Sequence, residues 1–414
     1  MTPPPIESSP AASAESSKAE QAAVRTLHHG AMSRILVVAT SGAGGDLQPL
    51  IAAALALRAR GHETPFAGDG SVKRSLQELG VAVELLPPEL DLGPRLAGSV
   101  RDAMAATNGD LVAAGPIVQE RMAAWAHEVA APVSRVILRL RPDCVVTSLF
   151  GVEVLQVASP PCPWAVINST FYVGPNPPRP IEQDIGPRAI PLLSRYASLL
   201  GAAGLVLHAT DQAFDFSFDR LPPRHHYVGP LGLWEPPGVP PPYLSEPGDP
   251  WVLVSISSQL QDDLALAETA LEALADRPAR TLLTVGPDHE PSEISRRPRN
   301  ACIERTARHS AVLERAVLLI SHAGHGSVMK ALWHGRPMVL MPWGRDQPGV
   351  AARAQALGVA EVVARASATA ETLGAAADRV MASADMRDTA AKHSARLRTT
   401  DPPSAAAVLV ESLL

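Results

Sequence analysis

The sequence is poor in cysteine, in lysine and in aromatic residues. Its 414 residues hold only three cysteines, Cys144, Cys162 and Cys302, an odd number with no Cys-x-x-Cys spacing. Neither a disulfide framework nor a zinc site is therefore predicted. Lysine occurs four times and the formal net charge is −6. The sequence thus predicts no basic groove for nucleic acid and no attraction to an anionic membrane.

Long apolar runs are missing as well. No stretch of about 18 apolar residues is free of charge and proline, so no membrane span is predicted. Residues 1–32 are rich in Pro, Ser and Ala and contain no apolar segment of the signal-peptide type. They predict a disordered tail and a cytoplasmic protein. Met32 stands directly before the first strand pattern and is a second candidate for the natural start.

Apolar residues, in contrast, make up 46% of the chain, which is enough for large cores. The length exceeds what a single core usually fills, so two domains are expected. Residues 233–250 are rich in proline, which cannot continue a helix or a central strand. The sequence therefore predicts a first domain over 33–232, a Pro-rich linker over 233–250 and a second domain over 251–414.

Short apolar runs alternate with helical stretches in both predicted domains. The pattern predicts strands at 34–40, 81–86, 144–148, 164–168, 205–208, 251–256, 281–285, 317–321 and 337–341, and helices at 50–60, 118–140 and 328–333. Continuous apolar strands are typical of parallel sheets that are covered on both faces. The predicted fold class is α/β, with two Rossmann-like, doubly wound domains facing a cleft. Ligands are expected at the carboxyl ends of the strands.

A glycine-rich turn, residues 42–46, follows the first strand. It misses the G-x-G-x-x-G pattern of dinucleotide-binding proteins, because Leu47 stands at the third glycine position and Asp69 comes late as a ribose partner. Asp46 ends the turn at the start of a helix, whose dipole favours the ionised carboxylate that a general base needs. A plain strand-to-helix turn is the alternative interpretation.

A second glycine-rich loop follows the strand at 317–321. Gly324 and Gly326 allow a ligand to approach the backbone, and the N–H groups of the following helix N-terminus favour an anion. Ser327 adds a hydroxyl and His322 a ring N–H, a combination that suits a diphosphate. After the next strand, an adjacent Asp and Gln offer acceptors and an amide donor of the kind that binds sugar hydroxyls.

This order of elements resembles a known signature. The pattern H-x-G-x-G-S, a helix ending in G-x-P, an apolar strand and then D-Q is similar to that of the family-one nucleotide-sugar glycosyltransferases. Their fold, GT-B, consists of two Rossmann-like domains with a Pro-containing linker. The G-D-x-x-P turn at 45–49, the segment 227–230 and the segment 252–258 with Gln261 and Asp262 are also similar to antibiotic and sterol-type members. The resemblance covers nearly everything from residue 33 onward.

The resemblance implies that the second domain binds the nucleotide sugar and that the last helix packs back on the first domain. Carried over to this sequence, the donor-binding residues are Ser257, Ser258, His322, Gly324, His325, Gly326, Ser327, Asp346 and Gln347. For His325, filling a turn position is the alternative. No metal and no other cofactor is implied, because helix N-termini and His322 stabilise the leaving diphosphate.

The implied reaction is an inverting glycosyl transfer. Many family members use a histidine as the base at the first turn, whereas this sequence has Asp46, as in the subset that resembles glycopeptide and sterol enzymes. Asp46 would take the proton of an acceptor hydroxyl while that oxygen attacks the anomeric carbon. The implied function is transfer of a hexose or deoxyhexose from a UDP- or dTDP-sugar to a hydrophobic natural-product aglycone, as in antibiotic biosynthesis and other secondary metabolism.

The acceptor pocket is expected in the first domain, in segments 87–114 and 170–198. Phe171, Tyr172 and Met104 are the named candidates there, and packing of these side chains onto the sheet is the alternative. The aromatic content of only 4% argues against a flat stacking platform.

Two positions depart from the family pattern. Val350 replaces the Asn of D-Q-x-x-N, and Ala323 replaces a common Gly after the histidine. These departures make a non-catalytic GT-B homologue that binds a partner one alternative. A nucleotide-sugar epimerase, which needs no acceptor, is another. A Rossmann oxidoreductase is a third, weakened by Leu47. The choice of UDP or dTDP, the sugar, the aglycone, the linkage and the oligomeric state stay open.

Overall fold

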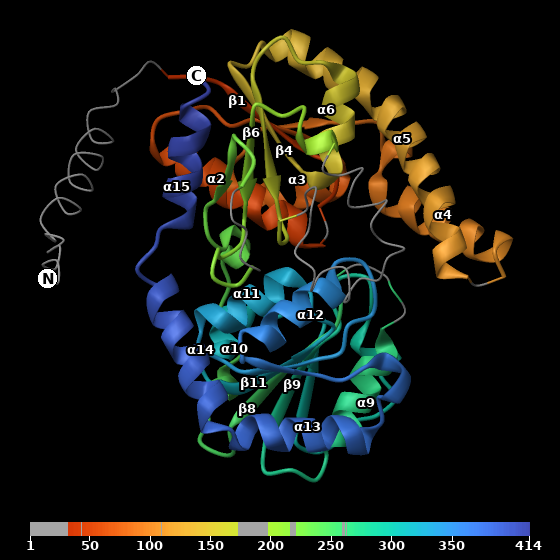
Figure 1. The fold of residues 1–414 in the computed structure, drawn as a ribbon, viewed down its shortest axis with the longest axis vertical. Helices are drawn as coiled ribbons and strands as arrows, with labels where there is room; N and C mark the ends of the chain where they lie inside the picture. Colours follow the sequence, from red (N-terminus) through yellow and green to blue (C-terminus); the bar gives the residue numbers. More distant parts are fainter. Residues whose placement is uncertain are drawn as a thin grey trace, which may run out of the picture.

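The alternating strands and helices form two parallel sheets in the computed structural model (Figure 1). The model describes residues 32–42, 44–108, 110–172, 198–215, 221–258, 261 and 263–414. The predicted tail over 1–31, most of the predicted acceptor segment 170–198 and Asp262 lie outside the described residues. All strand pairs within each sheet are parallel, which confirms the predicted α/β class.

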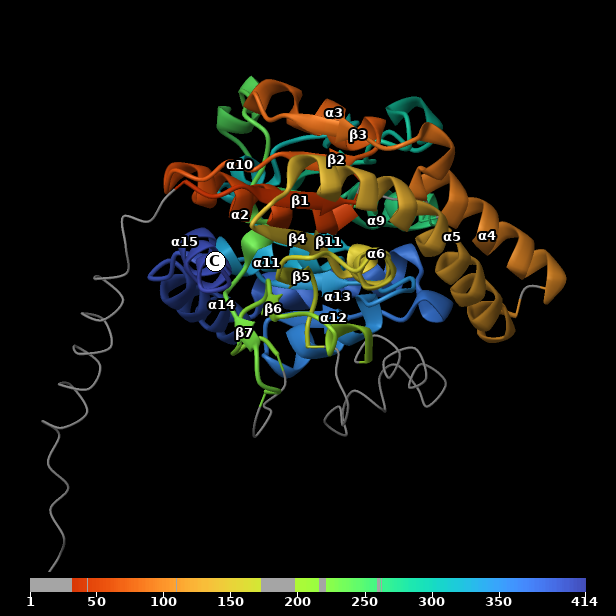
Figure 2. The ribbon, with the colours of Figure 1, turned by 90° about the horizontal axis from the view of Figure 1, so that it is seen from above.

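The first sheet, which defines the N-terminal lobe, has the strand order β3-β2-β1-β4-β5-β6-β7. Its strands are β1 (Ile35–Ala39), β2 (Phe66–Gly68), β3 (Val83–Leu85), β4 (Cys144–Ser148), β5 (Trp164–Asn168), β6 (Leu205–His208) and β7 (His225–Tyr227). Its helices are α2 (Leu47–Ala59), α3 (Gly70–Leu76), α4 (Leu92–Ala106), α5 (Leu111–Leu140) and α6 (Val152–Ala158). Helices α4 and α5 pack side by side and project from this lobe (Figure 2).

The second sheet defines the C-terminal lobe and has the order β10-β9-β8-β11-β12-β13. Its strands are β8 (Trp251–Ser255), β9 (Arg280–Thr284), β10 (Ala301–Glu304), β11 (Ala316–Ser321), β12 (Met338–Leu340) and β13 (Ala360–Val362). Its helices are α9 (Leu264–Leu274), α10 (His309–Leu313), α11 (His325–Trp333), α12 (Gln347–Ala356), α13 (Ala370–Ala382) and α14 (Ala384–Leu397), and α15 (Pro402–Glu411) follows them. Along the sequence, residues 228–250 separate the last strand of the first sheet from the first strand of the second. The domain boundaries that the proline pattern predicts stay a prediction.

The predicted elements agree best where the apolar run is long. The strands at 144–148, 164–168 and 205–208 begin and end as predicted. The four strands that the pattern did not predict are β2, β7, β10 and β13, which are short or only half-buried. Helix α11 begins at His325 rather than at residue 328, and α5 begins at Leu111 rather than at 118.

The sheet of the N-terminal lobe is buried on both faces. Ile35, Val37 and Ala39 of β1 belong to a core with α2 and α15, whereas Leu36 and Val38 belong to a core with α5 and α6. This alternation follows from the two-residue period of a strand. Helices cover both faces of the sheet and so bury the apolar side chains on each face. None of the helices in the described ranges is long and apolar enough to cross a membrane.

The last helix, α15, returns to the N-terminal lobe and lies on α2 (Figure 1). Its Ala406, Ala407 and Val410 are part of the N-terminal core. At its end, Glu411 accepts hydrogen bonds from Arg60 at 2.6 and 2.7 Å. The chain therefore connects the lobes twice, once through residues 228–250 and once through the segment before α15.

Candidate functional site

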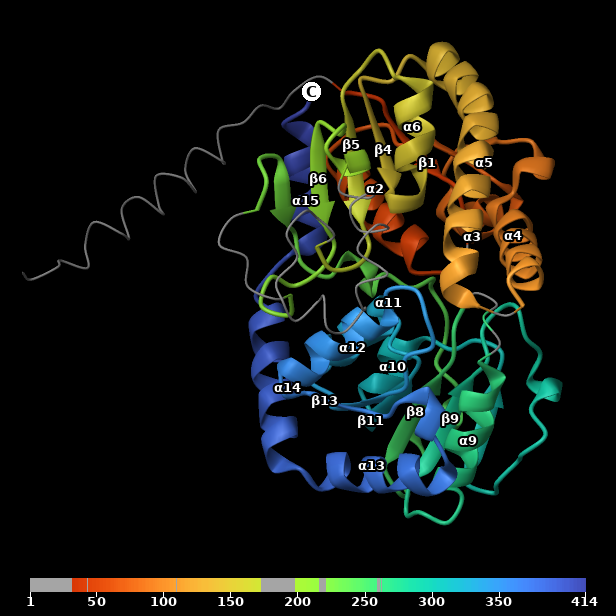
Figure 3. The same ribbon diagram turned by 45° about the vertical axis from the view of Figure 1, so that its right-hand side comes forward.

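The site forms where segments that follow the carboxyl ends of β1, β5, β8, β11 and β12 come together between the lobes (Figure 3). One of the hydrogen bonds that join the two lobes lies here. Thr170, two residues after β5, donates a hydrogen bond at 2.6 Å to Asp346, which follows β12 in the other lobe. Ligand sites of doubly wound sheets are found at this edge.

Asp46 lies at this edge as the last residue of a short 3-10 turn and directly before α2. Its side chain is buried, and its Oδ1 accepts a hydrogen bond from the Ser169 hydroxyl. Burial raises the pKa of Asp46 to about 6, and the Asp346 charge adds to this rise. The Ser169 hydrogen bond and the Arg345 charge oppose it. The carboxylate is thus still ionised at neutral pH but is a stronger base than an exposed Asp.

The donor loop, which we define as residues 322–327, follows β11 in the C-terminal lobe and leads into α11. The first intrahelical bond of α11 runs from the Val328 N–H to the Gly324 carbonyl at 3.1 Å. The N–H groups of residues 325–327 therefore belong to the first turn, where helix geometry leaves no intrahelical acceptor. A Cβ added to Gly326 would meet no atom within 4 Å, whereas one added to Gly324 would lie 2.5 Å from His322 Nε2. Open space and helix N–H groups occur together at Gly326.

Ala323, one of the two departures from the family pattern, has a φ of +67°. This left-handed conformation is free of strain for glycine and costs other residues about 1–2 kcal/mol. The structure thus gives the physical reason why glycine is common here. The side chain of Ala323 is fully buried, and its N–H donates to the Ser321 hydroxyl at 3.2 Å. Val350, the other departure, lies in the apolar core of the C-terminal lobe.

His322 is buried at the end of β11. Its Nδ1 lies 3.4 Å from the Ser255 carbonyl oxygen, which favours a proton on Nδ1 and leaves Nε2 facing Gly324. Burial lowers the pKa of His322, so the ring is neutral without a ligand. The predicted ring N–H toward a phosphate therefore needs the second proton, which a bound anion would favour.

Ser257 and Gln347 take part in one network that joins two loops of the C-terminal lobe. The Ser257 N–H and Gln261 Nε2 both donate to Asp263 Oδ2, at 2.8 and 2.9 Å. Gln347 Nε2 donates to Gln261 Oε1 at 2.8 Å. Gln347 Oε1 accepts from the N–H groups of Trp343 and Gly344. The Gln347 oxygen thus holds its own loop in shape, and its Nε2 connects this loop to the one that follows β8.

The remaining donor candidates differ in their surroundings. Ser258, which follows β8, and Ser327, in the donor loop, are both half-buried. His325 is buried between the lobes, with Nε2 2.9 Å from Thr210 Oγ1 and its ring edge-on to Phe214 at 6.1 Å. Burial lowers the pKa of His325 to about 4, so this ring is neutral. His325 thus contacts the N-terminal lobe, and a donor contact for it stays a prediction. No three His, Cys, Asp or Glu side chains in the described part of the chain cluster as metal ligands would.

The acceptor candidates Phe171 and Tyr172 are both buried. The Phe171 ring packs under the Arg353 guanidinium at 3.7 Å and against Gly349, where an added Cβ would lie 2.6 Å away. The Tyr172 ring stands edge-on to His208 at 5.4 Å. These contacts agree with the packing alternative, and an acceptor role for either residue stays a prediction.

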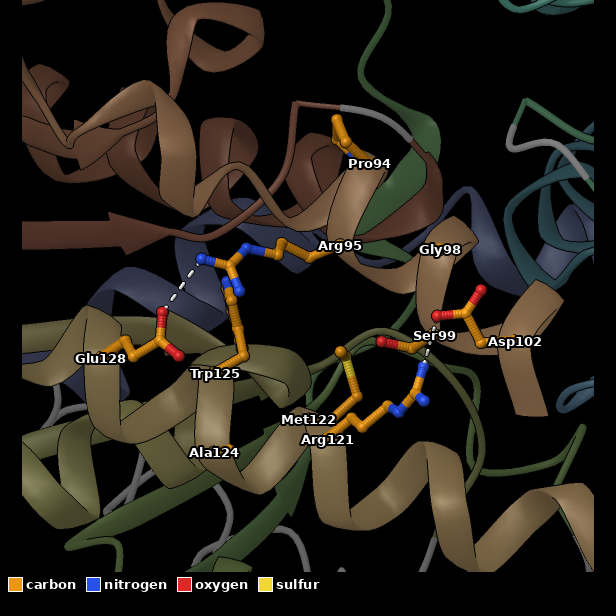
Figure 4. A pocket seen from close by; sticks show the side chains of 10 residues that line it. All are labelled: Pro94, Arg95, Gly98, Ser99, Asp102, Arg121, Met122, Ala124, Trp125 and Glu128. Carbon is orange, nitrogen blue, oxygen red and sulfur yellow. Dashed lines mark hydrogen bonds and ion pairs between the residues drawn. The ribbon is translucent and has the colours of Figure 1, made fainter. Parts of the chain in front are cut away.

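A cavity of about 350 Å³ lies between α4 and α5 and is lined in part by residues of the predicted acceptor segment 87–114 (Figure 4). Ion pairs between Arg95 and Glu128 at 3.0 Å and between Arg121 and Asp102 at 2.9 Å line it. Met104 is half-buried on α4 and is not among its described lining residues. Nothing in the cavity identifies an acceptor.

Sequence reasoning missed the two hydroxyls, Ser169 and Thr170, that contact Asp46 and Asp346. The available signal was their position directly after a correctly predicted strand. It also missed Asp263, which connects Ser257 to the Gln347 network.

Comparison with known proteins relates parts of this chain to glycosyltransferases. A model described as the glycosyltransferase family 28 C-terminal domain matches residues 257–402. Demethyllactenocin mycarosyltransferase of Streptomyces fradiae is 28% identical over 208 residues, which cover 49% of this chain and 43% of the relative. O-mycaminosyltylonolide 6-deoxyallosyltransferase of the same organism is 25% identical over 378 residues, which cover 78% of this chain and 84% of the relative. The chain thus spans less than half of the first relative and most of the second.

The fold also has solved counterparts. The calicheamicin glycosyltransferase CalG4 aligns with a TM-score of 0.73 at 20% identity, over 93% of this chain and 99% of that chain. At this identity the likeness concerns the fold, and it confirms the predicted GT-B arrangement. The fold is thus that of GT-B glycosyltransferases, and residues 257–402 are similar to the glycosyltransferase family 28 C-terminal domain.

Proposed function

We propose that the protein is an inverting glycosyltransferase that moves a hexose or deoxyhexose from a UDP- or dTDP-sugar to a hydroxyl of a hydrophobic small-molecule acceptor. The observation that carries this proposal is the buried, basic carboxylate of Asp46, on which Asp346 and Arg345 of the other lobe act. Open space at Gly326, in the first turn of α11, supports the diphosphate site. Asp46 and Asp346 are held by consecutive residues, so the base and the expected sugar contact lie close together. The relatives named for transferring mycarosyl and 6-deoxyallosyl groups support a sugar donor.

In the proposed step, the acceptor oxygen attacks the anomeric carbon as its proton passes to the Asp46 carboxylate. The new C–O bond forms on the face opposite the bond to the diphosphate, which breaks, so the configuration inverts. The diphosphate leaves with the bonding electron pair. We propose that the first-turn N–H groups of α11 stabilise the charge that develops on it, with Ser327, Ser257 and Ser258 as further donors and a doubly protonated His322 as a cation.

The acceptor class and the location are the least constrained parts of the proposal. A hydrophobic natural-product aglycone agrees with the antibiotic-type relatives. A cytoplasmic location and independence from metal ions are part of the same proposal.

The proposal is tested by incubating the protein with UDP-glucose and with dTDP-deoxysugars, each with a panel of hydrophobic aglycones, and following product mass. Since Asp46 must be ionised to accept a proton, kcat/KM should fall as the pH drops below about 6. The rate should be the same with EDTA present. Circular dichroism at each pH controls for unfolding. An acid limb near the ordinary Asp range would contradict the assigned base.

The alternatives give different results in the same experiment. A nucleotide-sugar epimerase would convert the donor without any aglycone. A non-catalytic homologue would bind UDP or dTDP, measured by calorimetry, without turnover in any combination. Either result would replace the transferase proposal.

A substitution at Gly326 tests the diphosphate site separately. Gly326→Ala should stabilise the free protein by up to about 1 kcal/mol, since alanine is the better helix former and its methyl meets no atom. The same methyl would occupy space that we assign to the diphosphate, so the Kd for UDP or dTDP should rise about tenfold or more. Gly115→Ala, on α5, also has open space around the new methyl and is the matched control. An unchanged Kd for Gly326→Ala would place the diphosphate elsewhere.

A further inference from the structure

We propose that Ser169 is a positioning residue for the base, because its hydroxyl holds one oxygen of the Asp46 carboxylate and so presents the other oxygen to the acceptor. This inference rests on the proposed function, since it presumes that Asp46 takes the acceptor's proton. None of the sequence patterns assigned a role to Ser169.

The contact itself is specific at the level of atoms. The Ser169 hydroxyl donates to Asp46 Oδ1, and the two residues follow the carboxyl ends of β5 and β1, which lie on either side of β4 in the same sheet. With Oδ1 engaged by a donor, the acceptor's proton is taken by Oδ2. A hydrogen bond to the charged form of a carboxylate stabilises that form. Ser169 therefore acts on both the orientation and the proton affinity of Asp46.

Hydrogen bonds of the neighbouring Asn168 side chain hold the turn that carries Ser169. The buried Asn168 side chain donates to the Phe171 carbonyl at 2.8 Å and accepts from the Thr170 N–H at 3.4 Å. Asn168 Nδ2 also lies 3.0 Å from His208 Nδ1, whose Nε2 lies 3.1 Å from His225 Nδ1. Burial lowers the pKa of His208 to about 3 and of His225 to about 4, so both rings are neutral. This arrangement fixes the backbone from which the Ser169 hydroxyl projects.

The charges that face Asp46 come from the other lobe and from its own helix. Asp346 and Arg345, on the loop between β12 and α12, act on it with opposite signs. Asp46 itself stands at the N-terminus of α2, whose dipole favours the carboxylate. Ser169 donates a hydrogen bond to Asp46, and this bond lowers the pKa of Asp46. Removal of the Ser169 hydroxyl should therefore raise that pKa.

Thr170 provides a matched comparison within the same turn. Its hydroxyl donates to Asp346 instead of Asp46, across the lobe interface. Thr170→Val removes this hydroxyl at nearly constant volume. It disturbs the same turn without removing a donor from Asp46.

The test compares Ser169→Ala, Ser169→Thr and Thr170→Val with the wild type. Ser169→Ala should lower kcat about 10- to 100-fold, as for the loss of a hydrogen bond to a charged group, and leave the KM for the donor nearly unchanged. It should move the acid limb of kcat/KM to higher pH, because the bond that opposes protonation is gone. Ser169→Thr should restore both, and Thr170→Val should leave the position of the limb unchanged.

A second readout does not depend on turnover. The carboxyl ¹³C signal of Asp46, identified by its absence in Asp46→Asn, should titrate at higher pH in Ser169→Ala than in the wild type. An unchanged kcat, limb and titration would overturn the inference. So would a fall in kcat with no shift of limb or titration, as from general loosening of the turn. If the titration shifts but no variant and no wild type turns over any donor, the contact stands and the inverting transferase proposal fails.

Discussion

Asp46→Asn is expected to lower kcat by about 10²- to 10⁴-fold, the range that a positioned general base contributes. The asparagine keeps the shape of the side chain and can still accept the Ser169 hydrogen bond at Oδ1, but it cannot take a proton at neutral pH. The Kd for UDP or dTDP should be nearly unchanged, because the proposed diphosphate site lies on α11 in the other lobe. Steady-state kinetics and calorimetry measure the two quantities.

Asp69→Asn is the matched control for this variant. Asp69 is also a buried aspartate at a helix N-terminus in the N-terminal lobe, where it accepts from the N–H groups of Ser71 and Val72 at 2.8 and 2.9 Å. Asparagine caps helices about as well, so kcat should stay near the wild-type value. If Asp46→Asn kept full turnover, or if Asp69→Asn lost as much as Asp46→Asn, the base would have to be assigned anew.

Asp215→Asn is expected to destabilise the protein by about 3–5 kcal/mol, the usual cost of breaking a buried ion pair. Asp215 follows β6 in the N-terminal lobe and accepts from Arg353 Nε of α12 at 2.6 Å, with both side chains 0% exposed. Its other oxygen accepts from the Tyr172 N–H at 2.7 Å and from the Tyr227 hydroxyl at 2.9 Å. The variant would leave the guanidinium charge buried without its carboxylate. Denaturant unfolding followed by circular dichroism measures the loss.

Asp378→Asn is the control for this second prediction. Asp378 accepts from Arg277 at 2.7 and 2.8 Å but is 56% exposed, so its loss should cost at most about 1 kcal/mol. The double variant Asp215→Asn with Arg353→Met should be more stable than Asp215→Asn, because no charge is left buried and the asparagine oxygen can still accept from Tyr172 and Tyr227. A loss for Asp215→Asn no larger than that for Asp378→Asn would show that the lobe interface does not depend on this pair.

The parts of the fold that the sequence predicts are those set by local pattern. The continuous apolar run at 144–148 predicts a buried parallel strand, and β4 is fully buried over those residues. The glycines of the donor loop predict its position between a strand and a helix. Strand β7, with the sequence His-His-Tyr, shows no apolar pattern and forms through pairing with β6, a contact that local sequence does not encode.

The site was predictable only within each lobe. Phe171 and Tyr172 were expected in an acceptor loop, yet Phe171 is covered by Gly349 and Arg353 of the C-terminal lobe. The pattern around Phe171 carries no information on a partner about 180 residues away in the chain. The same holds for Ser169 and Thr170, because the partners of their hydroxyls, Asp46 and Asp346, are brought to them only by the fold of the two lobes.

The return of α15 to the N-terminal lobe limits how this protein can be recombined with its relatives. A chimaera cut once within residues 228–250 would bring a foreign last helix against α2, where Ala406, Ala407 and Val410 complete the core. It would also exchange Glu411, the partner of Arg60. An exchange of the C-terminal lobe therefore needs two junctions, the second between α14 and α15, so that residues 402–411 stay with the parent of the N-terminal lobe.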